Sequence, residues 1–152
     1  MATAWRIVPE RRSSDAFSGE GARIAGGRWN SKGTRIIYTS NNKSLAALEL
    51  LVHISPSMPR KFKAFRLEFD DGMIEHLSPE TLPADWVIEP PGPATMAVGD
   101  AWARTAGSAI LAVLSIIIPN ELNFLLNPVH PDFPKIKIHP PEDFVFDPRL
   151  LE

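Results

Sequence analysis

The chain contains no cysteine among its 152 residues. A disulfide framework and a cysteine nucleophile are therefore both excluded. The N-terminal stretch has no apolar run before its charged residues, and a secretory signal peptide would need one. These absences favour a reducing compartment, and we expect the chain to be cytoplasmic.

Long apolar runs and a strong excess of one charge are also missing. The longest apolar stretch, residues 109–118, is far shorter than the roughly 20 residues that a membrane-spanning helix requires. The net charge is −2 and the sequence pI is about 6.1, whereas nucleic-acid-binding domains usually have a pI above ~9. We therefore expect neither membrane insertion nor direct binding of nucleic acid by this chain.

Several catalytic and nucleotide-binding motifs do not occur. The sequence has no G-x-G-x-x-G fingerprint between strand and helix, no P-loop and no G-x-S-x-G nucleophile elbow. The four histidines, which show no metal-ligand spacing, are His53, His76, His130 and His139. We expect no metal ion and no resident cofactor.

The length of the chain fits one domain over residues 1–152. Strands are predicted over residues 5–8, 35–40, 65–69 and 109–114, helices over 43–53 and 95–106, an ordered loop or turn over 123–131, and further sheet residues at Ile136, Ile138, Phe144 and Phe146. Because strands and helices alternate irregularly, the fold class is α+β with a mixed, mostly antiparallel sheet.

Glu49 is the first residue with a possible catalytic role. On the predicted helix it follows Leu45 by four residues and precedes Val52 by three, so it borders the apolar face. A carboxylate there is partly desolvated and needs a partner. It is either a peripheral glutamate paired with a surface lysine or a catalytic carboxylate that points into a cleft.

A glycine-rich segment, residues 19–33, supplies the second candidate group. Gly26 and Gly27 allow the backbone to approach a ligand closely, and Arg28 could hold a diphosphate with two parallel hydrogen bonds. Trp29 and Tyr38 offer flat surfaces on which a planar ring can stack. The other interpretation is a glycine-rich hairpin loop that carries a solvated arginine.

Polar residues near the C-terminal half complete the set. Ser115 lies between two apolar runs and is predicted to be buried, as an ordinary backbone-bonded serine or as part of a site. Asn123, Asn127 and His130 lie in the predicted loop, where such side chains either cap turns or orient an arginine or a ligand.

Six segments, taken in order, resemble the RES domain family, which is named after its Arg, Glu and Ser positions. These segments are WRI (5–7), GGRWNSKG (26–33), IIYTSNNKSLAALELLVH (36–53), GDAW (99–102), VLSIIIPNELNFLLNPVHP (113–131) and FVFDPRL (144–150). They cover nearly the whole chain. One departure is Leu114, where the family usually has proline before its serine.

The resemblance implies a fold similar to that of ADP-ribosyltransferase toxins and the role of a toxin paired with an Xre-type antitoxin. It also implies a homodimer. The site residues that it implies are Arg28, Glu49 and Ser115 as catalytic groups, and Arg6, Arg28, Tyr38 and Asn127 as groups that bind NAD.

The activity that the resemblance implies is degradation of NAD by cleavage of the nicotinamide–ribose bond. Water is the acceptor for a glycohydrolase, and inorganic phosphate is the acceptor for a phosphorylase. Transfer of ADP-ribose to a cellular protein is the alternative that uses the same pocket. A nucleotide-binding or interaction module without turnover is a third reading, from a different functional class.

Overall fold

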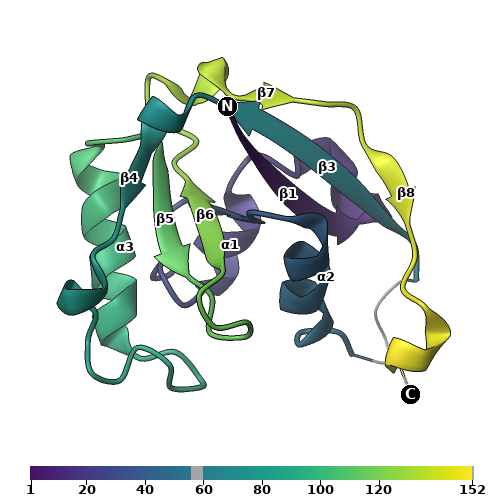
Figure 1. The fold of residues 1–152 in the computed structure, drawn as a ribbon, viewed down its shortest axis with the longest axis horizontal. Helices are drawn as coiled ribbons and strands as arrows, with labels where there is room; N and C mark the ends of the chain where they lie inside the picture. The colour runs from purple at the N-terminus through teal and green to yellow at the C-terminus, as the bar shows by residue number, and fades with distance from the viewer. Residues whose placement is uncertain (56–59, 152) are drawn as a thin grey trace.

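Residues 1–55 and 60–151 are described by the computed structural model, and in this part of the chain eight strands form one curled sheet (Figure 1). The strands are β1 (Ala2–Pro9), β2 (Ile37–Ser40), β3 (Phe62–Phe69), β4 (Ile74–His76), β5 (Ile110–Leu114), β6 (Leu122–Leu126), β7 (Lys137–Ile138) and β8 (Glu142–Phe144). Their order is β4-β5-β6-β2-β1-β3-β7, and β8 also pairs with β3. Only the β4–β5 pair is parallel among the described strands, which confirms the mixed, mostly antiparallel α+β class.

The sheet has two well-paired halves that meet at a narrow junction. On one side, β1 and β3 pair along their whole lengths, from Ala2 opposite Phe69 to Pro9 opposite Phe62. On the other side, β2 pairs with β6 along all of its residues. Between the halves, β1 and β2 pair at a single position, where Trp5 lies opposite Ser40. The two halves therefore diverge beside this point and leave room for a cleft.

Three α-helices accompany the sheet in the described residues. They are α1 (Glu20–Ala25), α2 (Lys43–Leu51) and α3 (Pro93–Thr105). The short 3-10 helices are η1 (Glu10–Asp15), η2 (Asp71–Met73), η3 (Pro79–Thr81), η4 (Phe133–Lys135) and η5 (Pro148–Leu151). The side chain of Asn42 caps α2 by accepting a hydrogen bond from the backbone N–H of Leu45 (2.7 Å).

Each half of the sheet has a helix packed against it. Trp102 of α3 belongs to a buried cluster with Trp29, Leu111 and Leu125. On the other half, α2 packs through a separate cluster, which includes Ile7, Ala46, Phe62, Ala64 and Phe146. The apolar faces of α2 and α3 thus fix these helices on opposite halves, with the divergence of the sheet between them (Figure 1).

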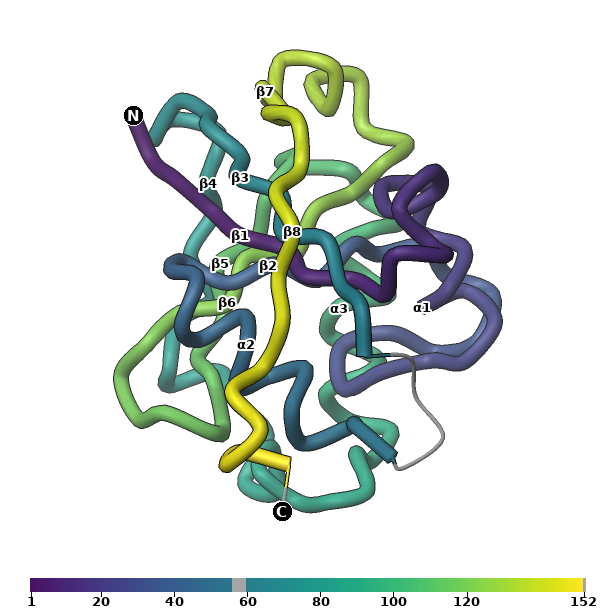
Figure 2. The backbone as a smooth tube through the Cα atoms, turned by 90° about the vertical axis from the view of Figure 1, so that its right-hand side faces the viewer, coloured from purple at the N-terminus to yellow at the C-terminus, as the bar shows by residue number. Residues whose placement is uncertain are grey.

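The C-terminal segment closes the β3 side of the molecule. It pairs with β3 through β7 and β8 and then continues past α2 to η5 (Figure 2). Its Phe146 makes an edge-to-face contact with Phe62 at a centroid distance of 5.4 Å. No helix in residues 1–55 and 60–151 is long and apolar enough to cross a membrane.

Most predicted elements are confirmed, but the ordered loop or turn predicted over residues 123–131 is wrong for residues 123–126 and right for the turn over 127–131. Leu122–Leu126 forms β6, a strand with neighbours on both sides. The asparagine and the prolines favoured a loop, yet Phe124, Leu125 and Leu126 are all buried between β5 and β2. Tertiary pairing overrode the local propensity.

The glycine-rich segment also differs from a hairpin loop. Residues Glu20–Ala25 form α1, with Gly19 (φ 78°) before it and Gly26 (φ 75°) after it. Both glycines hold a left-handed backbone angle that other residues rarely adopt. The glycines therefore mark the two ends of a short helix, which positions Arg28 just beyond it.

Substitution of Gly99 tests how closely α3 packs on the glycine-rich segment. A Cβ at Gly99 would lie 1.6 Å from the carbonyl oxygen of Trp29, so alanine cannot fit without displacing the backbone. We expect Gly99→Ala to lower the free energy of unfolding by about 3 kcal/mol or more. Urea denaturation measures this change.

Gly107→Ala is the matched control, because its Cβ would meet nothing closer than 3.8 Å. It should change the free energy of unfolding by less than about 0.5 kcal/mol. Equal stability of the two variants would contradict the close packing of α3 on Trp29.

Candidate active site

A cleft of about 810 Å³ opens where the two halves of the sheet diverge. Its walls come from β1, η1, α1, β2, α2, the loop before α3 and the turn between β5 and β6. Its ionisable and amide side chains are Arg6, Arg12, Asp15, Arg28, Tyr38, Glu49, His53, Glu89 and Asn123. A concave site that joins apolar walls to convergent polar groups is typical of ligand binding.

Glu49 points into this cleft from α2. Its Oε2 accepts hydrogen bonds from Asn123 Nδ2 (2.6 Å) and from Ser115 Oγ (3.2 Å). Asn123 is itself held by Ser40, whose hydroxyl donates to its Oδ1 (2.7 Å). The Oε1 atom of Glu49 has no hydrogen-bond partner within the described part of the chain. One carboxylate oxygen is therefore fixed by the protein, and the other is available to a ligand.

Ser115 supports Glu49 from behind the cleft surface. It is 3% exposed, as its burial between apolar runs predicted, and it is not part of the cleft lining. Its hydroxyl also accepts hydrogen bonds from the N–H groups of Ile117 (3.0 Å) and Ile118 (3.2 Å). Leu114, the departure from the family pattern, is paired with Leu122 in the β5–β6 ladder, so the backbone before Ser115 is extended.

Arg6 of β1 spans the divergence of the sheet. Its Nε donates to Ala16 O (2.7 Å) and its Nη1 donates to Tyr38 O (2.9 Å). Burial lowers the pKa of the guanidinium to about 10. Arg6 thus ties η1 and β2 to β1 and places a cation in the cleft wall.

Arg28 has most of its donors occupied. Its Nη1 donates to the carbonyls of Trp86 (3.0 Å) and Ile88 (2.7 Å), and its Nη2 pairs with Glu89 Oε2 (2.5 Å). The side chain of Arg28 is 11% exposed, whereas that of Glu89 is 64% exposed. The loop before α3 therefore surrounds the guanidinium with two backbone carbonyls and the exposed carboxylate of Glu89.

Tyr38 contributes its ring to the cleft wall and its hydroxyl to hydrogen bonds within the fold. Its ring lines the cleft, while its hydroxyl donates to Asn30 Oδ1 (2.6 Å) and accepts from the N–H of Trp29 (3.1 Å). A Cβ at Gly27 would lie 2.7 Å from this hydroxyl, so glycine is needed there. Gly27 thus allows the backbone to approach the protein's own tyrosine closely.

Asn127 lies away from the cleft. It is fully buried, its Nδ2 donates to Ala103 O (3.1 Å), and its Oδ1 accepts from the N–H of Val129 (3.1 Å). His130 likewise accepts from the N–H of Asp132 (2.9 Å). Of the three polar residues predicted in one loop, only Asn123 lines the cleft. The turn-capping interpretation describes the other two.

Sequence reasoning did not select Arg12, Asp15, His53 or Glu89 for the cleft. His53 follows Glu49 by four residues, and this spacing could have placed both on one face of the helix. The other three gave no local signal, because η1 and the loop before α3 reach the cleft only through the tertiary fold.

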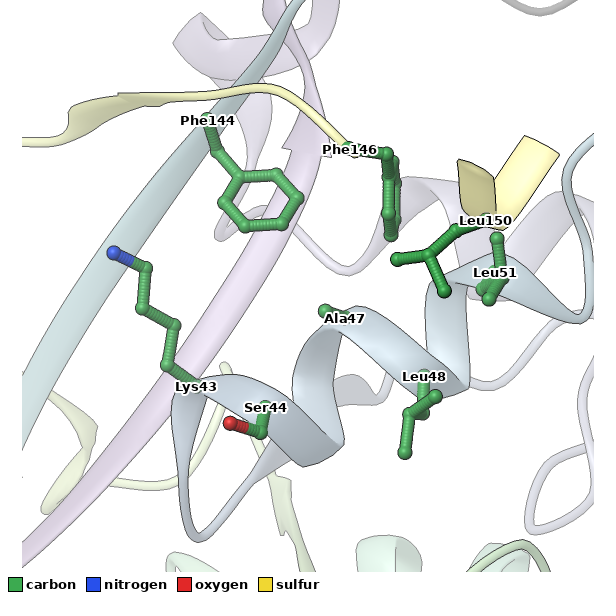
Figure 3. A pocket seen from close by; sticks show the side chains of 8 residues that line it. All are labelled: Lys43, Ser44, Ala47, Leu48, Leu51, Phe144, Phe146 and Leu150. Atoms are coloured by element: carbon green, nitrogen blue, oxygen red, sulfur yellow. The ribbon is translucent and has the colours of Figure 1, made fainter. Parts of the chain in front are cut away.

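A second hollow, of about 400 Å³, lies on the other side of α2 (Figure 3). It is lined by Lys43, Ser44, Ala47, Leu48, Leu51, Phe144, Phe146 and Leu150. The rings of Phe144 and Phe146 and the leucines give it an apolar surface without a carboxylate or an arginine. The carboxylates and arginines that line these two hollows therefore lie on the Glu49 side of α2.

Over residues 1–55 and 60–151, no group of three or more histidine, aspartate or glutamate side chains is arranged to hold a metal ion.

The family model of the RES domain matches residues 3–147. The chain belongs to the RES domain family. The match spans both halves of the sheet and every cleft residue described above.

Two relatives are similar to this RES domain over nearly their whole lengths. The Prs ADP-ribosylating toxin of Sphingobium sp. (strain YBL2) is 38% identical over 153 residues, which are 97% of this chain and 95% of that protein. The protein named Toxin Res from Yersinia enterocolitica is 40% identical over 148 residues, which are 96% of this chain and 97% of that protein.

A solved structure has a similar fold. The crystal structure of the M. tuberculosis MbcT–MbcA toxin–antitoxin complex contains a chain that superposes with a TM-score of 0.78 at 19% identity. The superposition covers 95% of this RES domain and 84% of that chain.

The single tyrosine of the chain allows its environment to be tested directly. Burial raises the pKa of Tyr38 above its ordinary value of about 10. Because the folded state favours the protonated phenol, its contribution to stability is complete below pH ~10 and is lost as the pH rises further.

We expect ultraviolet absorbance of the folded protein to show no tyrosinate as the pH passes ~10, while the unfolded protein in guanidinium titrates near that value. Coincident titration curves for the folded and unfolded protein would contradict the burial of the Tyr38 hydroxyl.

Proposed function

We propose that this RES domain is the toxin of a toxin–antitoxin pair and that it consumes NAD by breaking the nicotinamide–ribose bond. Relatives that match nearly the whole chain carry toxin names, and one of these names includes ADP-ribosylation. Transfer of ADP-ribose from NAD to any acceptor requires the bond to nicotinamide to break. The same first step therefore serves hydrolysis, phosphorolysis and protein modification.

The anchoring of Glu49 is the observation that carries this proposal. Departure of nicotinamide leaves positive charge on the ribose, as in glycoside cleavage. A carboxylate with one oxygen held by Asn123 and Ser115 and the other free can stabilise that charge without reorganising. Nicotinamide leaves as a neutral molecule, so no general acid is needed.

The remaining cleft residues fit the other parts of NAD. Arg28 would hold the diphosphate, which takes the place of the Glu89 carboxylate on its guanidinium. Arg6 adds a buried cation in the same cleft, and Tyr38 offers its ring to the nicotinamide. Ser115 acts as a positioning residue through Glu49, because it does not reach the cleft surface.

Modification of a cellular protein is the second candidate, and the name of the Sphingobium relative favours it. The acceptor is then a side chain of the target instead of water or inorganic phosphate. The open cleft is compatible with each acceptor, so the product must be identified directly.

We also propose an antitoxin partner of the Xre type, which would cover the cleft between the glycine-rich segment and Ser115. The similar solved chain comes from a toxin–antitoxin complex. Homodimerisation and a cytoplasmic location stay predictions from the family resemblance. Hydrogen exchange of the complex tests the position of the antitoxin, since protection on the opposite face alone would contradict it.

Replacement of Glu49 tests the proposed reaction. We expect Glu49→Gln to lower the rate of nicotinamide release from NAD by about 10²–10³-fold, because the amide cannot stabilise the developing cation. Chromatography of free nicotinamide measures the rate, with and without inorganic phosphate. Glu142→Gln is the control, since this glutamate lies on β8 outside the cleft and should leave the rate unchanged.

The same assay identifies the acceptor. Release that depends on phosphate indicates a phosphorylase, and release without phosphate indicates a glycohydrolase. If purified protein releases no nicotinamide, mass spectrometry of a lysate tests for ADP-ribose on a target protein. Absence of both products from folded protein would contradict the proposed enzyme and favour a binding module.

A further inference from the structure

The arginines of the cleft differ in how many of their donors the protein already uses. Arg6 gives two hydrogen bonds to backbone carbonyls, and Arg28 gives two more besides its pairing with Glu89. These contacts hold both guanidinium groups in place and reduce what each can offer to a ligand. A cleft for an anionic ligand would gain from a cation with free donors.

Arg12 has such free donors. It lies on η1, is exposed and lines the cleft. No hydrogen bond or ion pair joins its side chain to any residue of 1–55 or 60–151. A guanidinium carries five N–H donors, so Arg12 retains its full capacity for an oxyanion.

The surroundings of Arg12 leave room for a ligand to approach. Its Nη1 would be 3.4 Å from a Cβ built on Gly21, so the guanidinium lies beside α1 at a residue without a side chain. Gly19, Gly26 and Gly27 line the same cleft. Arg12 therefore lies beside a glycine of α1 in a cleft that further glycines line, where a phosphate group can approach the backbone closely.

Arg12 is also close enough to Arg6 for the charges of the two side chains to interact. Asp15 raises the pKa of the neighbouring Arg6, while Arg12 lowers it to a smaller extent. Arg12 and Arg6 thus repel each other, while the Asp15 carboxylate, which lines the same cleft, attracts Arg6 more strongly than Arg12 repels it. A phosphate that contacts both guanidinium groups would relieve the repulsion between them.

We propose that Arg12 binds the diphosphate of the dinucleotide substrate and is the cleft arginine that contributes most to its affinity. This inference rests on the proposed function. The planar guanidinium can donate two parallel hydrogen bonds to phosphate oxygens. Arg28 then contacts the same diphosphate from the glycine-rich segment, where Glu89 must first give way.

Binding of NAD to the Glu49→Gln protein tests this role without turnover. We expect Arg12→Gln in that background to weaken NAD binding about tenfold or more, as measured by calorimetry at low salt. Arg11→Gln is the matched control, because Arg11 is exposed on the same 3-10 helix but does not line the cleft. Both substitutions remove one positive charge, so only a direct contact separates them.

Two further ligands identify the phosphate that Arg12 recognises. ADP-ribose, which keeps the diphosphate, should lose affinity to the same extent as NAD. Nicotinamide riboside, which has no phosphate, should bind the two variants equally. A loss confined to the binding of inorganic phosphate would overturn the proposal and assign Arg12 to the acceptor instead.

The outcomes separate this inference from the proposed function. If NAD binds and Arg12→Gln matches Arg11→Gln, the role of Arg12 is wrong while NAD remains the ligand. If the Glu49→Gln protein and the wild type both fail to bind NAD, the proposed function fails and the role of Arg12 fails with it.

Discussion

The hydrogen bonds to Oε2 of Glu49 are the contacts on which the site depends. They join α2 to the end of β5 and to the start of β6, which lie 66 and 74 residues further along the chain. A carboxylate that borders an apolar helix face must be compensated, and here the partners are a neutral amide and a neutral hydroxyl. Neutral partners leave the negative charge available to the cleft, whereas a lysine partner would have cancelled it.

The position of Glu49 follows from the shape of the sheet. Because β1 and β2 meet at one position, the halves carried by β3 and β6 diverge, and α2 spans the opening from one side. Arg6 secures the same opening by bonding to Ala16 and Tyr38. A regular ladder between β1 and β2 would bring the halves together and fill the cleft.

Local sequence patterns predicted the elements better than they predicted the contacts. The alternation of Phe65, Leu67 and Phe69 and the spacing of Leu45 and Leu48 define β3 and α2 without knowledge of the fold. β6 was missed because Asn123 suits a loop, and its strand conformation comes from pairing on both sides.

The candidate site was predictable only in part, because its contacts join residues that are far apart in sequence. The family resemblance named Arg28, Glu49 and Ser115, and the structure brings Glu49 and Ser115 into contact while Arg28 lines the same cleft. It also named Asn127, whose buried amide caps a turn away from the cleft. Asn123 and Glu89 reach their partners across 74 and 61 residues of sequence, a relation that no local pattern records.

A double-mutant cycle between Ser115 and Glu49 tests the central claim, that Ser115 acts through the carboxylate. The readout is nicotinamide release at saturating NAD, with circular dichroism to establish that each variant is folded. We expect Ser115→Ala to slow release about tenfold in the wild-type background and to have no further effect in the Glu49→Gln background. Equal losses in the two backgrounds would contradict the account, because Ser115 would then act independently of Glu49.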